Sequence, residues 1–362
     1  MARPDERPLR RLPQLETRRQ DLERCVFCPK LCRSACPVSN VDTRETVTPW
    51  GKMSMAYFVA NESVELAESF AQPAWACTGC FGCREHCDHE NDVTGTLFEA
   101  RSAMVSAGTA PASVKRVLEG YDPVVPRADA PSDDNAKTAV LIGCEHARQK
   151  TAAGVDTIVA TAKLTQAKVC QATVCCGAPL LYAGDQSRFQ EQARRFAESV
   201  RGKDQLIVGD AGCAATIRVH FAEKLRMPVL HFSELAAREV TRLKRLDLEG
   251  AVRWHDPCQL GRGLGVYDAP RQILSRVLGR APDEFARARE DARCSGAGGL
   301  LPVTMPGVAR GIAEQRLADH DRSGGGTIVT ACASSARAFA RAAGGEGQVL
   351  DLATVVARAL ES

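Results

Sequence analysis

A string of cysteines near residue 80 has the spacing that indicates chemistry most directly. Cys77, Cys80, Cys83 and Cys87 follow the pattern Cys-x2-Cys-x2-Cys-x3-Cys. Thiols this close together can wrap around a single object, and a 4Fe–4S cluster is the object that this spacing holds. Small residues inside the loop allow its backbone to turn tightly. The string therefore predicts an iron–sulfur cluster loop.

A second string lies upstream and has almost the same pattern. Cys25, Cys28, Cys32 and Cys36 are followed by Pro37, which gives Cys-x2-Cys-x3-Cys-x3-Cys-Pro, one residue longer than the usual ferredoxin string. The proline fixes its own φ and ends the local helix. In ferredoxins with two clusters, the fourth cysteine of each string binds the cluster of the other string. The two strings therefore predict a crossed pair of clusters.

The crossed pattern assigns four thiols to each of two 4Fe–4S clusters. Cluster 1 takes Cys25, Cys28, Cys32 and Cys87, and cluster 2 takes Cys77, Cys80, Cys83 and Cys36. Two four-cysteine zinc sites are the alternative, but zinc usually joins two separated Cys-x2-Cys knuckles, which compact strings fit poorly. His86 and His89 flank Cys87, and we expect them to be solvated or hydrogen-bonded rather than ligands.

Further cysteines gather in the second half of the chain. Cys144, Cys175, Cys176 and Cys213 each follow or end a strand-like stretch, where parallel sheets place their sites. They form a candidate third site for a metal or an iron–sulfur cluster. Cys170 falls outside this pattern and is expected to be a packed core thiol.

The second half then repeats itself. Cys258, Cys294 and Cys332 follow Cys144, Cys175 and Cys213 at a nearly constant offset, and Ser295 takes the place of Cys176. Three thiols can bind a metal less securely than four can. The second copy is therefore a weak metal site, or a scaffold that has lost its cofactor.

The elements that must position these cysteines differ between the two halves. Helical patterns cover residues 50–60, 63–70, 95–108 and 113–119. Beyond a proline- and aspartate-rich linker, short apolar strands at 137–143 and 204–209 alternate with helices at 152–163 and 186–200. Alternating strands and helices indicate a parallel α/β layer.

The predicted fold class is α+β multidomain, with an all-α N-terminal domain of the α-helical ferredoxin type and two repeated α/β cysteine-rich domains. The predicted boundaries are a polar arm at 1–24, the ferredoxin domain at 25–120, a linker at 121–137, and the two cysteine-rich domains at 138–247 and 248–362. We expect the arm to be mobile and to end in a short helix; a docking arm for an acidic partner is the alternative.

Composition narrows the choice of partners and compartment. The 362 residues carry a net charge of only +3 and 5% aromatic residues, which argues against a nucleic-acid-binding surface. The N-terminus lacks the apolar segment of a signal peptide, and no apolar run approaches a membrane span. We therefore expect a cytoplasmic protein without its own anchor, peripheral to the inner face of the membrane through a partner. In that compartment cysteines are metal ligands or redox groups rather than disulfides.

The chain resembles the heterodisulfide-reductase-type iron–sulfur proteins with two cysteine-rich domains. This family includes the iron–sulfur subunit of glycolate oxidase and the C subunit of anaerobic glycerol-3-phosphate dehydrogenase. The resemblance covers about residues 20–360. Its most specific parts are Cys175-Cys176-Gly177 with its flanking cysteines and the strings at 255–262, 265–271 and 294–299.

The resemblance implies an iron–sulfur electron-transfer subunit that passes electrons between a flavoprotein dehydrogenase, or another redox subunit, and a quinone, a carrier or a membrane-bound partner. No residue is expected to act as an acid, a base or a nucleophile. The family pattern ends each cysteine-rich domain in Cys-x2-Cys, where this chain has Thr216 and Ser335. Two alternatives are reduction of a disulfide-type substrate at the first cysteine-rich domain and a non-redox metal-binding adaptor.

Overall fold

The computed structural model describes residues 8–345 and 349–361, which form two compact units. The first unit runs to Tyr121 and also includes Pro179–Arg188 and Arg293–Ala313. The second unit comprises Asp122–Ala178, Phe189–Ala292 and the chain from Glu314 onward. Two segments of the repeated half therefore pack within the compact unit that the N-terminal residues build.

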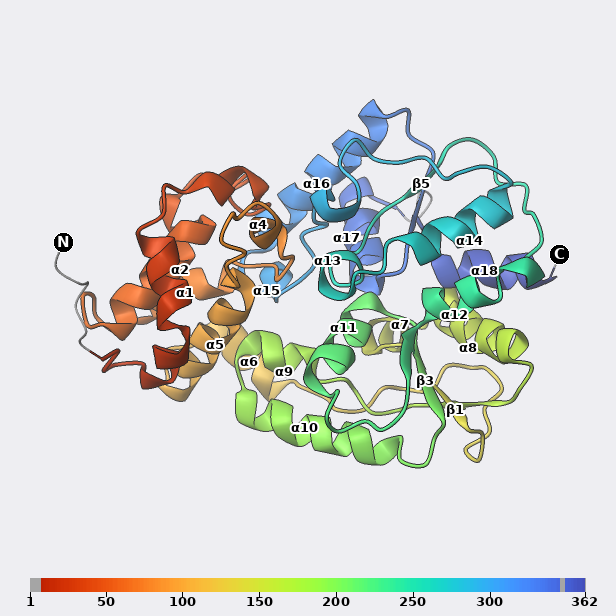
Figure 1. Cartoon of the computed structure of the whole chain (residues 1–362), viewed down its shortest axis with the longest axis horizontal. Helices are drawn as coiled ribbons and strands as arrows, with labels where there is room; N and C mark the ends of the chain where they lie inside the picture. The colour runs from red at the N-terminus through yellow and green to blue at the C-terminus, as the bar shows by residue number, and fades with distance from the viewer. Residues whose placement is uncertain (1–7, 346–348, 362) are drawn as a thin grey trace. The chain divides into compact units, whose positions relative to one another are not determined.

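In its described residues the first unit is helical (Figure 1). Its N-terminal part contains, with 3₁₀ helices labelled η, η1 (Pro13–Arg18), α1 (Arg19–Val26), η2 (Leu31–Ala35), η3 (Glu45–Val47), α2 (Pro49–Ala60), α3 (Glu68–Ala71), η4 (Gln72–Trp75), α4 (Gly82–Glu85), α5 (Val93–Ser106) and α6 (Ala112–Glu119). The helices expected at 50–60, 95–108 and 113–119 are confirmed as α2, α5 and α6. The one expected at 63–70 is wrong for most of its length, because Glu62 has a φ of +69° and the Ser63 N–H bonds to the Asn61 side chain, which turns the chain after α2.

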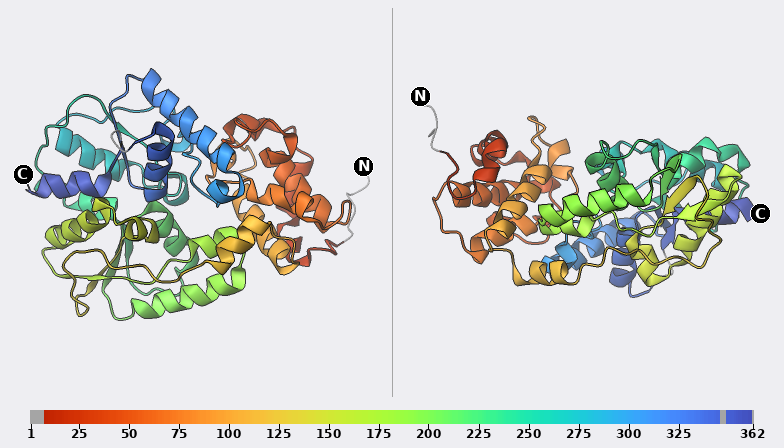
Figure 2. Two further views of the ribbon diagram at one scale, coloured as in Figure 1. Left: turned by 180° about the vertical axis from the view of Figure 1, so that it is seen from behind. Right: turned by 90° about the horizontal axis from the view of Figure 1, so that it is seen from below.

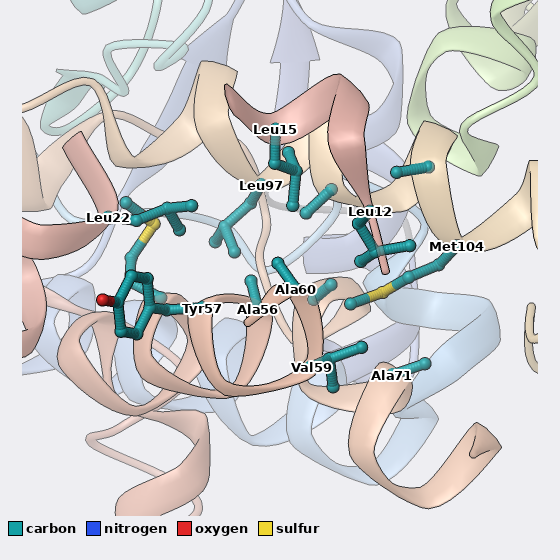
Figure 3. Close-up of a cluster of buried hydrophobic side chains, with 14 of the residues drawn as sticks. Leu12, Leu15, Leu22, Ala56, Tyr57, Val59, Ala60, Ala71, Leu97 and Met104 are labelled. Atoms are coloured by element: carbon teal, nitrogen blue, oxygen red, sulfur yellow. The ribbon is translucent and has the colours of Figure 1, made fainter. Parts of the chain in front are cut away.

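The core of the first unit corrects the expectation for the N-terminal arm. Leu9, Leu12, Leu15 and Leu22 are at most 1% exposed and belong to one buried cluster with residues of α2 and α5. Figure 3 shows Leu12, Leu15 and Leu22 of this cluster with Ala56 and Leu97. Leu9 and Leu12 precede η1, Leu15 lies on η1 and Leu22 lies on α1. Apolar side chains three to four residues apart give such a segment one face to bury. The described residues 8–24 therefore contribute four leucines to the core, whereas residues 1–7 of the expected mobile arm lie outside the described residues.

The second unit contains two parallel sheets. One has the order β2-β1-β3-β4 and the other the order β5-β6-β7. The strands are β1 (Thr138–Leu141), β2 (Val169–Gln171), β3 (Gln205–Val208), β4 (Val229–His231), β5 (Val252–Trp254), β6 (Thr327–Thr330) and β7 (Val349–Asp351). The remaining helices are α7 (Cys144–Gln149), α8 (Ala152–Thr165), α9 (Ala178–Ala183), α10 (Gln186–Ser199), α11 (Ala211–His220), α12 (Phe232–Arg238), η5 (Val240–Arg242), α13 (Gly261–Leu264), α14 (Asp268–Leu278), η6 (Arg289–Asp291), α15 (Leu301–Thr304), α16 (Pro306–Arg322), α17 (Ala333–Ala343) and α18 (Leu352–Glu361). The expected alternation of strands and helices is confirmed.

The two sheets follow the sequence repeat. β1 leads into the helix that begins at Cys144, and β5 leads into the turn that holds Cys258. Asp283 forms a parallel bridge to Arg253 of β5, the place that β2 occupies beside β1. The repeats contact each other through α8 and α18, which lie side by side (Figure 2), and through the hydrogen bond from Thr354 of α18 to Asp156 of α8.

The segment predicted as a linker packs against the sheet of the first repeat. The N–H of Val125 donates to the carbonyl of Thr173, and the N–H of Cys175 donates to the carbonyl of Pro123, both at 2.7 Å. Residues 123–125 therefore hold the backbone that presents Cys175. In the described part of the chain, no helix combines the length and the apolar character needed to cross a membrane.

Candidate iron–sulfur sites

The cysteine string of residues 77–87 forms a tight turn followed by a short helix. Gly79 has a φ of +69° and its N–H donates to the Cys77 sulfur at 3.4 Å. Phe81, at a φ of +60°, leads into α4. A hydrogen bond to sulfur and a left-handed turn are what a short loop needs to point several thiols toward one place.

The structure brings Cys36 of the first string to this loop. One small cavity is lined by Cys36, Cys77, Cys80 and Cys83, with Lys52 among the other wall residues. A side chain at Gly82 would lie 3.2 Å from the carbonyl oxygen of Ala35, so glycine allows the two strings to approach. The thiols assigned to cluster 2 thus share one cavity.

The other four thiols influence one another as well. Burial raises the pKa of Cys25 to about 12; the Asn91 amide, which donates to the Cys25 sulfur at 3.0 Å, opposes this, and Cys32, Cys87 and Cys28 add to it. Burial likewise raises the pKa of Cys32 to about 11, with contributions from Cys28, Cys36 and Cys87. Cys87 therefore lies among the thiols of the first string. His86 hydrogen-bonds through Nδ1 to the carbonyl of Gly82, at 3.1 Å.

Two buried cations accompany the cluster 2 thiols, and the sequence interpretation did not include them. Lys52 places its Nζ 3.4 Å from the Cys36 sulfur. Burial alone would lower the pKa of Lys52, but the nearby Cys36, Cys77 and Cys83 thiolates raise it. Arg101 donates to the carbonyl of Cys77 at 2.9 Å, and burial lowers its pKa to about 10, which still leaves it charged at neutral pH.

A signal for both cations exists in the sequence. Lys52 is the one charged residue of α2, whose other residues are largely apolar. Arg101 falls in the apolar stripe of α5, at helical spacing from Leu97 and Met104. A charge within an apolar stripe needs a partner when it is buried, and here the partners are thiolates and carbonyl oxygens.

The four thiols of the first cysteine-rich repeat converge in the second unit. The sulfurs of Cys176 and Cys213 are 3.4 Å apart. A hydrogen bond with Cys175 is the main cause that raises the pKa of Cys144 and that of Cys176, and burial adds to both. The candidate third site is thus a continuous group of buried or half-buried thiols. Cys170 is partly exposed on β2, so the expectation of a packed core thiol is wrong.

The three thiols of the second repeat are divided between the two compact units. Cys294 lies in the first unit, and Cys258 and Cys332 lie in the second. Burial raises the pKa of Cys332 to about 12, and the Asp210 carboxylate adds to that shift. The neighbours of Cys332 are therefore of a different kind from those of the first repeat, where thiols influence thiols.

One turn recurs at three cysteines. Gly177 donates its N–H to the Cys175 sulfur at 3.4 Å, and Gly296 donates to the Cys294 sulfur at 3.3 Å. Both glycines have a φ close to +80°, and they repeat the turn of Gly79 and Cys77. The replacement of Cys176 by Ser295 therefore leaves the turn itself intact.

The donor set fits iron–sulfur clusters. Soft thiols, backbone N–H groups aimed at sulfur and buried cations are the groups that stabilise an anionic iron–sulfur core. Among the described residues, no three His, Cys, Asp or Glu side chains are grouped closely enough to hold a single metal ion. The residues that would hold clusters are the eight N-terminal cysteines and the four of the first repeat.

Comparisons with known proteins agree with this chemistry. A family model described as a cysteine-rich domain (CCG) matches residues 138–218 and again 252–336, and one described as a 4Fe-4S dicluster domain matches residues 21–91. A subunit of the fumarate reductase (CoM/CoB) of Methanothermobacter marburgensis is 25% identical over 86% of this chain and 66% of its own length. A subunit of the dihydromethanophenazine:CoB–CoM heterodisulfide reductase of Methanosarcina barkeri is 25% identical over 89% of this chain and 91% of its own length.

A solved structure shares the fold. The crystal structure of a hypothetical protein from Helicobacter pylori aligns with a TM-score of 0.60 at 10% identity, over 97% of this chain and 77% of that one. The first match to the cysteine-rich model contains β1, β2 and β3, the second contains β5 and β6, and the dicluster match contains both cysteine strings. The chain therefore joins a 4Fe–4S dicluster domain to two cysteine-rich (CCG) domains, and it is similar to iron–sulfur subunits of heterodisulfide reductase and fumarate reductase.

Proposed function

We propose that the protein is an electron-transfer subunit with two 4Fe–4S clusters. Cys25, Cys28, Cys32 and Cys87 would hold cluster 1, and Cys36, Cys77, Cys80 and Cys83 would hold cluster 2. The observation that supports this most strongly is the cavity whose wall contains a thiol of the first string and three thiols of the second.

A bound 4Fe–4S cluster supplies one-electron chemistry. The residues of the chain determine where that electron is stable. Asn91 and Gly79 donate hydrogen bonds to sulfur, and Lys52 and Arg101 bring positive charge to the thiols of cluster 2. None of these roles requires a general acid, a general base or a nucleophile.

The names of the relatives suggest the kind of partner. Both relatives compared above are subunits of reductase complexes. We expect the donor to be a flavoprotein dehydrogenase or a similar redox subunit. We expect the acceptor to be a quinone or a carrier, reached through a membrane-bound partner at the cytoplasmic face.

Convergence of Cys144, Cys175, Cys176 and Cys213 favours a further cluster in the first cysteine-rich repeat. It is also the observation that supports the second candidate function, reduction of a disulfide-type substrate at that place. Against the second candidate, Thr216 occupies the position of the fifth family cysteine and bonds its hydroxyl to the carbonyl of Gly212 at 2.8 Å. The electron-transfer function needs no fifth thiol.

Anaerobic purification followed by iron, sulfide and zinc analysis tests the proposal. Two cubanes give about eight irons per chain, with two EPR signals that interact on reduction. Zinc without sulfide would contradict the proposal and support the adaptor.

A third cluster would add iron that disappears in Cys176→Ser and persists in Cys170→Ser, the matched control outside the thiol group. Turnover of a disulfide substrate by the wild type, lost in Cys176→Ser, would instead favour the second candidate.

A further inference from the structure

Positive charge is distributed unequally around the two sets of thiols, the set assigned to cluster 1 and the set assigned to cluster 2. Lys52 and Arg101 are 2% and 0% exposed, and both lie against the set of Cys36, Cys77, Cys80 and Cys83. In the described part of the chain, neither cation forms an ion pair with a carboxylate. Asp42 lies near enough for Lys52 to help lower its pKa, but the stronger cause is its pairing with Arg44, at 2.6 Å.

Arg101 is fixed in place by four carbonyl oxygens. It donates to those of Ala74 at 3.0 Å, Cys77 at 2.9 Å, Tyr182 at 2.8 Å and Gly299 at 3.1 Å. Its guanidinium also stacks on Phe98, 4.8 Å from the ring centroid. A cation held by neutral acceptors keeps its full charge beside the Cys77 loop.

The cations that neighbour the other set in sequence are exposed and already paired. The side chains of Arg24, Lys30 and Arg33 are 42%, 43% and 41% exposed, and each has an acidic partner, Asp21 for the first and Glu45 for the other two. Solvent and salt screen such charges. The buried donor to this set is the neutral amide of Asn91.

Reduction of a cluster adds one negative charge, and a buried positive charge stabilises the reduced form more than a screened one does. Resting on the proposed function, we infer that Lys52 and Arg101 hold the reduction potential of cluster 2 above that of cluster 1. With both clusters bound, an electron on cluster 1 would pass to cluster 2, so that cluster 1 would be oxidised as cluster 2 is reduced. Cluster 2 is thus the station where the electron is most stable within the first unit.

The surroundings of the Cys77 loop point to the next acceptor. Arg101 joins this loop to Tyr182 and Gly299, which lie in segments of the cysteine-rich half. A side chain at Gly298 would meet the carbonyl oxygen of Thr78 at 2.3 Å, so the glycine-rich segment lies directly against the loop. The loop that would hold cluster 2 therefore lies against segments that belong in sequence to the cysteine-rich repeats, which would make cluster 2 the exit station.

EPR-monitored potentiometric titration of the full, anaerobically purified chain tests this. Cys28→Ser and Cys80→Ser, each altering one signal, first assign the signals to the two clusters. In the wild type, the cluster 2 signal should appear at the higher potential. Lys52→Gln should lower the ratio of reduced to oxidised cluster 2 about tenfold at a fixed potential, which corresponds to about 59 mV for one electron.

Matched variants separate charge from packing. Lys52→Arg keeps the charge and should restore most of the cluster 2 potential. Lys30→Gln removes an exposed charge near cluster 1 and should shift either potential by less than a third of the Lys52→Gln effect. An equal shift of both signals in Lys52→Gln, or no shift with both clusters present, would overturn the inference.

If Lys52→Gln loses its iron, titration of the wild-type protein alone tests whether cluster 2 has the higher potential. A wild-type titration in which cluster 1 has the higher potential contradicts the inference while leaving the electron-transfer function intact. Absence of both cubane signals from iron-loaded wild type would instead contradict the proposed function. The two failures therefore give different results in one titration.

Discussion

The Asp210 carboxylate accepts a hydrogen bond from the N–H of Ala333 at 3.0 Å, across the boundary between the two cysteine-rich repeats. Its other oxygen accepts from the N–H groups of Gly212 and Cys213, at 2.9 and 3.1 Å. One buried side chain thus caps α11, which carries Cys213, and reaches the first turn of α17, which follows Cys332. The nearby hydrogen bond from Ala211 to the carbonyl of Ala331, at 3.2 Å, completes the junction.

Removal of this carboxylate should weaken both repeats. Asp210→Ala deletes the cap of α11 and leaves the Ala333 N–H unpaired, and we expect a loss of about 2–3 kcal/mol in stability. Asp210→Asn keeps one acceptor and should lose less. Thermal unfolding measures the effect, and Asp204→Ala, at an exposed loop position, should stay within about 0.5 kcal/mol. Equal unfolding temperatures for Asp210→Ala and Asp204→Ala would show that the junction contributes nothing.

Glycine at position 298 is required by close packing against the cluster 2 loop. A Cβ there would lie 2.3 Å from the carbonyl oxygen of Thr78, closer than any real contact, so Gly298→Ala must displace the Cys77–Cys80 backbone. We expect a lower iron content and a lower unfolding temperature. Gly307→Ala, at a position with nothing within 4 Å of the added carbon, is the matched control and should keep both at the wild-type level. Full iron content in Gly298→Ala would contradict the packing argument.

Acid should destabilise both repeats through buried histidines, His231 in the first and His255 in the second. Burial lowers the pKa of His255 to about 3 and that of His231 to about 4. The unfolded chain takes up these protons below about pH 6.5, so the stability is fully present above that pH and is lost as the pH falls toward the lowered values. For His255 alone, the loss at pH 5 is about 2 kcal/mol.

His255→Leu should therefore reduce the drop in unfolding temperature between pH 7.5 and pH 5. Comparison of the two pH values within each protein removes the packing change that the substitution itself causes. A drop as large as that of the wild type would show that His255 does not contribute to acid sensitivity.

Features that depend on residues close together in sequence could be predicted. Cysteine spacing indicated iron–sulfur chemistry, and alternating apolar strands and helices indicated the two parallel sheets. The pattern of Leu9, Leu12 and Leu15 was equally local, yet neighbouring prolines and arginines concealed it, and these residues proved to be core.

The features that the sequence did not indicate depend on contacts between residues that are distant in sequence. Arg101 bonds to carbonyls of Ala74, Tyr182 and Gly299, and no spacing rule relates those positions. The inclusion of Pro179–Arg188 and Arg293–Ala313 in the first unit has the same origin, because packing between distant segments decides it. The role of Asp210 likewise depends on a contact between α11 and α17, which are distant in sequence, so no local pattern indicated it.

Arg101 itself offers the sharpest test of the first unit. Arg101→Met leaves four buried carbonyl oxygens without their donor, and we expect a loss of about 3–5 kcal/mol together with iron loss that affects the cluster 2 signal first. Arg101→Lys retains the charge but has fewer donors, so its iron content should fall between those of the wild type and Arg101→Met. Arg116→Met, at an exposed position on α6, should change stability by no more than about 0.5 kcal/mol. Anaerobic thermal unfolding with iron analysis distinguishes these outcomes: iron loss that affects the cluster 1 signal first would show that Arg101 does not serve the Cys77 loop.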